Sequence, residues 1–300
     1  RRVPTAPMAA PPLYFPVEPT PLSMKAGLLK FPSETEPFFL VDDERSALLA
    51  VKRDTRPEVR ARRCGNAVET ADEARAEAAV LAWMDETAAR EAPEVLADVD
   101  ADVASGRPRW DAYGRALQED FAILHRGHDG RGRAIVLHVS GPSGWRPEHL
   151  VGADFSAIHG PVPGFPGRAT DADDRRDAAS KSMVASMIDR GPYVRYVWTV
   201  SVDAHFDHHP DSGLRARWTP ESMQAEELYF RVERQTTVPF STDDASLFLI
   251  RTFVYPFSRL SDDQREILAT ALAVMPPEIA AYKGLSDAIA PAVAHLRRPR

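Results

Sequence analysis

The stretch LYFRVERQTTV at residues 228–238, followed by SLFLIRTFVY at 246–255, decides the fold of this chain. Both runs are rich in the aromatic and β-branched residues that favour strands. In the first run Leu228, Phe230 and Val232 alternate with polar residues, which places apolar and polar side chains on opposite faces of a strand. The two runs therefore predict two strands in an order compatible with a hairpin.

Three more strands are predicted earlier in the chain. Residues 121–125 and 133–140 are apolar runs joined by the glycine-rich segment 127–132, which indicates a hairpin, and residues 193–201 form a third run. Helical patterns surround these strands at residues 42–52, 70–91, 111–118, 171–189, 261–275 and 277–296. Five strands with helices between and around them predict an α+β domain on an antiparallel sheet.

The N-terminal residues differ in character from the rest. Prolines recur through residues 1–37, which excludes a regular helix or an inner strand there. The apolar residues of this segment, such as Phe15, predict an extended arm lying on the body of the protein. We expect residues 38–300 to form a single domain with helical flanks, in which Thr70 and Ser261 are helix N-caps.

Composition limits the class of protein. Apolar residues make up 44% of the 300-residue chain, enough for a hydrophobic core, and the net charge of −7 argues against a general nucleic-acid binder. No run of about 18 apolar residues occurs, so we expect no membrane helix. The two N-terminal arginines are not followed by an apolar segment, which predicts no secretion signal and a cytoplasmic location.

Nucleotide-binding loops and cysteine-rich metal motifs do not occur in the sequence. Neither Gly-x-Gly-x-x-Gly after a strand nor Gly-x-x-x-x-Gly-Lys-Ser/Thr is present. The one cysteine, Cys64, excludes an internal disulfide; neighbouring arginines could lower its pKa, but we interpret it as an incidental thiol. His205, His208 and His209 lie among aspartates in an irregular stretch, which we interpret as a solvated loop rather than a zinc site.

Residues 158–164, with the sequence IHGPVPG, form a more specific motif. Two prolines and two glycines fix and turn the backbone directly after His159. A neutral imidazole on such a turn suits an axial iron ligand, because its orientation is held at little entropic cost. The alternative is a buried structural histidine bonded to a carbonyl group, and residue chemistry alone favours that alternative.

The first of the two quoted strands has a dense polar face. It carries Tyr229, Arg231, Glu233 and Gln235. Such a face indicates a pocket or a buried ion-pair network. If the two strands pair, Arg251 lies within reach of Glu233, and either a cross-strand salt bridge or a catalytic role would explain the pair.

The strand at 193–201 contributes two further candidates in the run RYVW at residues 195–198. Trp198 suits the wall of a flat cofactor, or it fills the core. Arg195 suits pairing with an anionic carboxylate.

Several of these segments, taken together and in order, resemble the alpha subunit of the haem-dependent oxidative N-demethylases. Residues 158–164 are similar to the family's Ile-His-x-Pro-Val-Pro-Gly signature, and residues 231–236 to its Arg-Val-Glu-Arg-Gln-Thr signature. Shorter similarities are Gln118-Glu119-Asp120, Trp145-Arg146-Pro147 and Ile250-Arg251-Thr252. The resemblance covers roughly residues 42–285. Val197 stands where the family usually has asparagine, which removes a hydrogen-bond donor and acceptor near the expected pocket.

The resemblance implies a PAS-like domain that binds haem b, with His159 as the ligand of the iron. It also implies oxygen-dependent demethylation of a small amine, with electrons from separate NAD(P)H-dependent flavin and iron–sulfur partners. This chain has no motif for those partners' cofactors. The substitution at Val197 is compatible with a different substrate, such as a metabolite of specialised metabolism.

The resemblance also suggests roles for the polar candidates. Glu233 would hold a substrate ammonium group, and Arg231 or Arg251 would orient Glu233 or polarise the oxygen. Arg195 and Arg234 would pair with the haem propionates. Two other functions remain open: a non-catalytic haem-binding sensor, because fold alone does not fix function, and a haem-free assembly partner.

Overall fold

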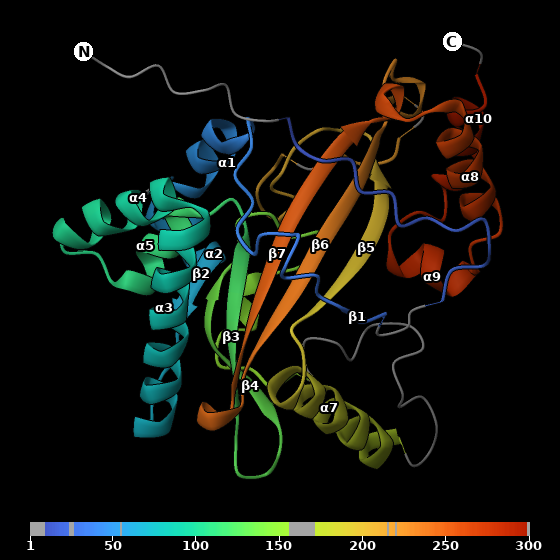
Figure 1. The fold of residues 1–300 in the computed structure, drawn as a ribbon. Coiled ribbons are helices and arrows are strands. Elements are labelled where there is room, and N and C mark those ends of the chain that lie inside the picture. The colour runs from blue at the N-terminus through green and yellow to red at the C-terminus, as the bar shows by residue number, and fades with distance from the viewer. Residues whose placement is uncertain are drawn as a thin grey trace, which may run out of the picture.

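The computed structural model describes residues 10–23, 27–54, 56–155, 172–214, 216–219 and 221–298. For residues 172–177 it describes the backbone but not the side chains. At the centre of the described residues is a seven-stranded sheet in which every neighbouring pair is antiparallel (Figure 1). The strand order is β1-β5-β6-β7-β3-β4-β2. The strands are β1 (Leu29–Lys30), β2 (Cys64–Asn66), β3 (Asp120–Arg126), β4 (Gly132–His138), β5 (Tyr193–Ser201), β6 (Tyr229–Phe240) and β7 (Ala245–Pro256).

The α+β prediction with an antiparallel sheet is confirmed, but the predicted number of strands is wrong. The five predicted strands correspond to β3–β7. The sheet has two further strands, β1 and β2, at its two edges. They contain two and three residues, too few for a periodic pattern to be visible in the sequence.

Helices surround this sheet on several sides (Figure 1). Among the described residues they are α1 (Arg45–Lys52), α2 (Pro57–Arg63), α3 (Ala71–Glu91), α4 (Pro93–Ala104), α5 (Arg109–Ala116), α7 (Ala172–Asp189), α8 (Asp262–Ala273), α9 (Pro277–Tyr282) and α10 (Ile289–Leu296). In this part of the chain, none of the helices combines the length and the apolar character needed to cross a bilayer.

Local sequence signals explain where several helices begin and end. The Thr70 hydroxyl accepts a hydrogen bond from the Glu73 amide at 3.2 Å, and the Glu73 carboxylate caps the Thr70 amide in return. Ser261 caps α8 in the same way, so both predicted N-caps are confirmed. The single helix predicted at 277–296 is instead two helices, because Gly284 adopts a left-handed φ of 68° after α9.

The sheet has two faces with different coverings. One face packs on α3 through Phe121, Ile123 and Leu249, and farther along the strands on α8 through Phe230 and Phe253. The proline-rich arm packs into the part of the core that lies under α8, through side chains such as Phe15 and Val17. The Tyr255 hydroxyl donates to the carbonyl of Pro12 at 2.5 Å and accepts from the Tyr14 amide at 3.2 Å. The opposite face of the sheet carries the cavity described below.

The Gln118-Glu119-Asp120 segment that precedes β3 is a structural anchor. All three side chains are buried. Gln118 donates to Asp42 at 2.7 Å, and Glu119 accepts the amide of Leu40 at 2.9 Å. Asp120 accepts from Lys52 at 2.6 Å. This segment therefore fixes residues 40–52 against the sheet and accounts for one of the short family-like motifs without a catalytic role.

Candidate functional site

A cavity of about 530 Å³ lies over the second face of the sheet. That size falls in the range of small-molecule and cofactor sites. Its walls combine apolar strand residues with side chains from α7, from α9 and from the connections between strands. The aromatic and methionine members of the described lining are Trp145, Phe155, Met183, Met187, Trp198, Trp218, Phe248 and Tyr282.

Strand alternation explains why the charged residues of β6 reach this cavity. Arg231, Glu233 and Gln235 line it, whereas the intervening Val232 belongs to the core on the other face. The polar face predicted from the sequence is therefore one wall of a pocket. The apolar part of the same floor comes from β3 and β7, through side chains such as Leu124 and Ile250.

The carboxylate of Glu233 is held by two neighbours. The Ser143 hydroxyl donates to Oε1 at 2.5 Å, and the Gln235 amide donates to Oε2 at 2.8 Å. The Ser143 hydroxyl also accepts from Nε of Arg231 at 3.0 Å. Arg231 thus orients Glu233 through Ser143 and not by direct contact.

Arg231 itself is 1% exposed and bound to main-chain carbonyl groups. Its Nη2 donates to Gly141 at 2.9 Å and to Phe206 at 3.0 Å, and its Nη1 donates to His205 at 3.2 Å. The Phe206 ring packs so closely on Gly141 that a Cβ atom there would lie 2.4 Å from it. The guanidinium therefore joins two connections, around Gly141 and Phe206, at the cavity wall.

Two other cations line the cavity on the side of β5 and α9. Arg195 makes no hydrogen bond or ion pair with any residue that the structure describes, and burial lowers its pKa against the effect of Glu233. Lys283 donates to the main-chain carbonyl of Trp198 at 2.8 Å. Burial lowers the pKa of Lys283 to about 8, an effect that Glu233 partly opposes. No sequence motif singled out Lys283, which follows α9 in an otherwise ordinary amphipathic segment.

Two sequence-predicted arginines lie on the opposite face of the sheet, away from the cavity. Arg251 is fully buried and pairs with Asp42 and Glu44, each at 2.9 Å, so the expected contact with Glu233 is wrong. Strand register places Glu233 opposite Thr252, and the Arg251 side chain points to the other side.

Arg234 is similarly displaced from its expected role. It donates to the carbonyl of Pro37 at 2.8 Å and stacks over the Phe31 ring at 5.2 Å. Because this even-numbered β6 residue faces the N-terminal segment, Arg234 is not available to a ligand in the cavity. Arg234 and Arg251 instead fasten residues 31–44 to the sheet.

The remaining predicted residues are Trp198 and His159. Trp198 is 5% exposed, packs against Phe230 in the core, and also borders the cavity. Both of the roles expected for it are therefore compatible with its position. His159 lies outside the described residues. Phe155, at the end of the described stretch that precedes it, lines the cavity.

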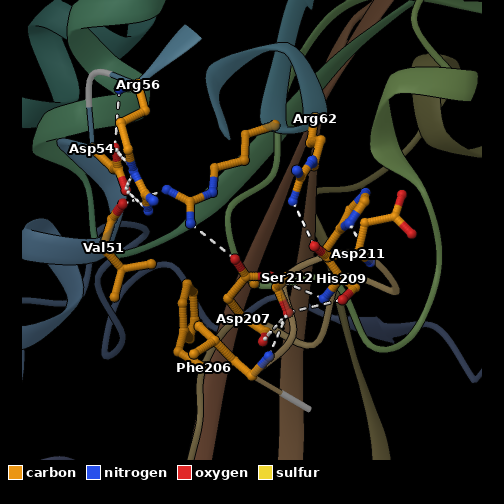
Figure 2. A network of polar contacts seen from close by, with 12 residues as sticks. Val51, Asp54, Arg56, Arg62, Phe206, Asp207, His209, Asp211 and Ser212 are labelled. Atoms are coloured by element: carbon orange, nitrogen blue, oxygen red, sulfur yellow. Dashed lines mark hydrogen bonds and ion pairs between the residues drawn. The ribbon is translucent and has the colours of Figure 1, made fainter. Parts of the chain in front are cut away.

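The histidine-rich stretch is only in part the solvated loop expected from its composition, since His205 and Asp211 are exposed but the residues between them are mostly buried. Asp207, His208 and His209 are all buried. Asp207 pairs with Arg63 at 2.8 Å and accepts the His209 amide at 2.9 Å. Figure 2 shows this network, in which Arg62 donates to the main-chain carbonyl of Asp211 at 2.7 Å. Ion pairs within the protein thus bury a segment that is polar in sequence.

Two groups of possible metal ligands occur in the described part of the chain. They are Cys64 with Asp111 and His138, and Glu148 with His209 and Asp211. Burial raises the pKa of the Cys64 thiol, and this effect outweighs the nearby arginines that had suggested a lower pKa. Neither group lies among the described residues that line the cavity.

Comparison with known proteins identifies the family. A search of curated proteins finds no match. The family model described as haem-dependent oxidative N-demethylase, alpha subunit-like, matches residues 96–293, more than half of the chain. The match spans the five long strands and the described residues of the cavity wall except Leu28. The chain belongs to the haem-dependent oxidative N-demethylase alpha subunit-like family.

Proposed function

We propose that this chain binds haem b in the cavity and catalyses oxidative N-demethylation of a small amine or a specialised metabolite. The observation that carries the proposal is the cavity itself, an apolar pocket of about 530 Å³ with cations and an oriented carboxylate in its wall. Family membership supplies the cofactor class and the type of reaction.

The strand connections support a PAS-like domain. The first long strand, β3, pairs with the last, β7, at the centre of the sheet. The crossover from β4 to β5 contains the helix α7. A PAS domain has the same closure of its sheet and a helical crossover at the same place. The edge strands β1 and β2 are additions to that arrangement.

The described lining suits haem in its apolar character and in its charge. Its aromatic, methionine and aliphatic side chains suit a flat apolar macrocycle. The lining has three cationic side chains, Arg195, Arg231 and Lys283, and one carboxylate, Glu233. His208 also lines the cavity, but it is bonded to Asp203 and is not counted. This excess of positive charge suits the two propionates of haem b, with Arg195 as the first candidate partner.

His159 is our candidate for the iron ligand. Phe155 lines the cavity, and the four residues from it to His159 span at most about 14 Å in an extended chain. This tether length is compatible with an imidazole that reaches the cavity. Its Gly- and Pro-rich sequence context is the family signature on which the assignment rests.

In the proposed reaction, one methylated secondary amine, one O2, two electrons and two protons give the primary amine, formaldehyde and water. Haem, when bound, supplies the site of oxygen reduction, and a separate NAD(P)H-dependent flavin and iron–sulfur reductase supplies the electrons. The carboxylate of Glu233 binds the substrate ammonium group by a charge-assisted hydrogen bond. Ser143 and Gln235 fix its orientation, and Arg231 positions Ser143.

The function is tested by formaldehyde release. The haem-loaded protein is supplied with O2, a surrogate reductase and a panel of N-methylated amines, and formaldehyde is quantified against amine consumed. We expect equimolar formaldehyde and demethylated amine with at least one member of the panel. Haem binding without formaldehyde from any amine would instead indicate the sensor function, and absence of haem binding would indicate the assembly partner.

A further inference from the structure

The positive charge on the β5 and α9 side of the cavity is only partly balanced within the described protein, because one carboxylate, that of Glu233, acts on two cations. Arg195 has no hydrogen-bonded or ion-paired partner there, and the only hydrogen bond of the Lys283 side chain is to the main-chain carbonyl of Trp198. Both residues are half-buried at the cavity wall, so a ligand carboxylate in the cavity would meet two incompletely solvated cations and form charge-assisted hydrogen bonds with them. The Glu233 oxygens accept hydrogen bonds from Ser143 and Gln235, and no hydrogen bond or ion pair joins Glu233 to Arg195 or Lys283 in the described part of the chain.

The two cations come from different parts of the fold and meet at the same wall. Arg195 lies in the first half of β5, and Lys283 follows directly after α9. Arg195, Tyr282 and Lys283 all line the cavity, and the bond of Lys283 to the Trp198 carbonyl brings its ammonium group onto β5, the strand of Arg195. In keeping with this placement, Arg195 lowers the pKa of both Lys283 and Tyr282. A planar guanidinium and an ammonium group together provide the donors that a carboxylate needs.

From this geometry we infer that Arg195 and Lys283 form a carboxylate-binding subsite at the β5–α9 end of the cavity. The carboxylate can come from either of two sources, a haem propionate or a carboxylated amine substrate such as an N-methyl amino acid. The haem and amine assignments rest on the proposed function, but the carboxylate chemistry does not.

The subsite is tested first without haem. The haem-free protein is titrated with the fluorescent fatty acid cis-parinaric acid and with its methyl ester, which differ only in the carboxylate. We expect the acid to bind at least about tenfold more tightly, the effect of one hydrogen bond between charged groups. Lys283→Met and Arg195→Met should each reduce this ratio, and the double variant should bring it close to one. The exposed residues Lys30 and Arg190 provide the matched controls, Lys30→Met and Arg190→Met, which should keep the wild-type ratio.

Two further titrations distinguish the sources. If the subsite holds a propionate, haemin binds more tightly than haemin dimethyl ester in the wild type, and Lys283→Met removes that preference. If it holds a substrate, haemin affinity is the same in the wild type and in the variant. N-methylglycine then shifts the Soret band of the wild type only, and dimethylamine shifts both.

The acid-to-ester ratio decides the inference. A ratio near one in the wild type, or a ratio that both cavity variants leave unchanged, would overturn it. A preference for parinaric acid that depends on Arg195 and Lys283, in a protein that binds no haem, would support the subsite and contradict the proposed function instead. Failure of the carboxylate subsite and failure of the haem proposal therefore give different results.

Discussion

At the scale of single residues, Glu233 is the group whose chemistry matters most for an amine substrate. Its two carboxylate oxygens accept from Ser143 and Gln235, which leaves lone pairs on both oxygens for a ligand. The side chain faces a cavity with apolar walls, where a charge-assisted hydrogen bond is stronger than in water.

We predict that Glu233→Gln lowers kcat/KM for the amine about tenfold to a hundredfold, because it removes a hydrogen bond worth about 1.5–3 kcal/mol to a charged group. The change should appear mainly in KM, as measured by formaldehyde release. The exposed Glu226 gives the matched control, Glu226→Gln, which should behave as wild type. A Glu233→Gln variant with normal KM and normal kcat would exclude Glu233 from amine binding.

A second residue-scale prediction concerns the charge of Lys283. Burial lowers the pKa of Lys283 to about 8. Arg195 lowers this pKa further, and Glu233 raises it. The neighbouring Tyr282 has a pKa that burial raises. Raising the pH through about 8 therefore removes the ammonium charge, while the carboxyl group of parinaric acid stays ionised. The affinity for parinaric acid should fall between about pH 7 and about pH 10.

The same titration in Lys283→Met separates this effect from others. The variant has no group to deprotonate in that range at this position, so its affinity should change much less with pH. Equal pH profiles in wild type and variant would mean that Lys283 does not contact the carboxylate.

The sequence predicted the positions of side chains correctly where the period-two alternation of a strand fixes them. It failed where tertiary contacts determine which side chains reach the cavity. Alternation placed Arg231 and Glu233 on a polar face that does line the cavity. The same alternation requires Arg234 to face the opposite side of the sheet from Glu233. This orientation is incompatible with the propionate contact that the family resemblance suggested for Arg234. Lys283 reaches the cavity through tertiary packing of α9, which the local sequence pattern does not encode.

At the scale of elements, Arg231 joins the connection that follows β4 to the one that follows β5. It donates to the carbonyls of Gly141, His205 and Phe206 and to the Ser143 hydroxyl. Replacing it leaves several buried acceptors without a donor. The position is therefore important both for stability and for the orientation of Glu233.

We predict that Arg231→Met lowers the free energy of unfolding by about 3 kcal/mol or more, from lost charge-assisted bonds and unpaired carbonyls. Urea unfolding followed by circular dichroism measures this. Arg190→Met, at an exposed position, should change stability by less than about 0.5 kcal/mol. Equal stabilities of the two variants would show that Arg231 does not hold the two connections together.

The N-terminus of α3 gives a second element-scale prediction. Thr70→Ala removes the side-chain acceptor of the capping box and should lower the free energy of unfolding by about 1 kcal/mol. Thr70→Ser, which keeps the hydroxyl, should retain most of that stability in the same urea titration. A full loss in Thr70→Ser as well would point to the methyl group, and not to the cap.

Elements with strong local signals were predictable, and elements defined by their partners were not. The capping residues Thr70 and Ser261 marked two helix starts correctly. The short strands β1 and β2 exist only because β5 and β4 supply their hydrogen-bonding partners. Residues 206–209 are buried, although the stretch was expected to be solvated, because ion pairs such as that of Asp207 with Arg63 cannot be recognised in the sequence.

At the scale of the whole molecule, one sheet separates a structural face from a binding face. The structural face packs on α3 and α8 and is fastened to residues 31–44 by Arg234 and Arg251. The binding face carries the cavity, with α7 and the end of α9 contributing to its walls. The antiparallel α+β architecture could be predicted from the sequence. Which face of the sheet carries the cavity could not, because that depends on strand order and register.

The central proposal is that haem binds in this cavity with His159 as the ligand of its iron. It is tested most directly by titrating haemin into the haem-free wild type and into His159→Gly, each with and without added imidazole, and recording the Soret band. We expect a saturable band in the wild type that is lost or shifted in the variant and restored by imidazole, which replaces the missing side chain. Identical spectra for wild type and His159→Gly, unaffected by imidazole, would contradict the proposal.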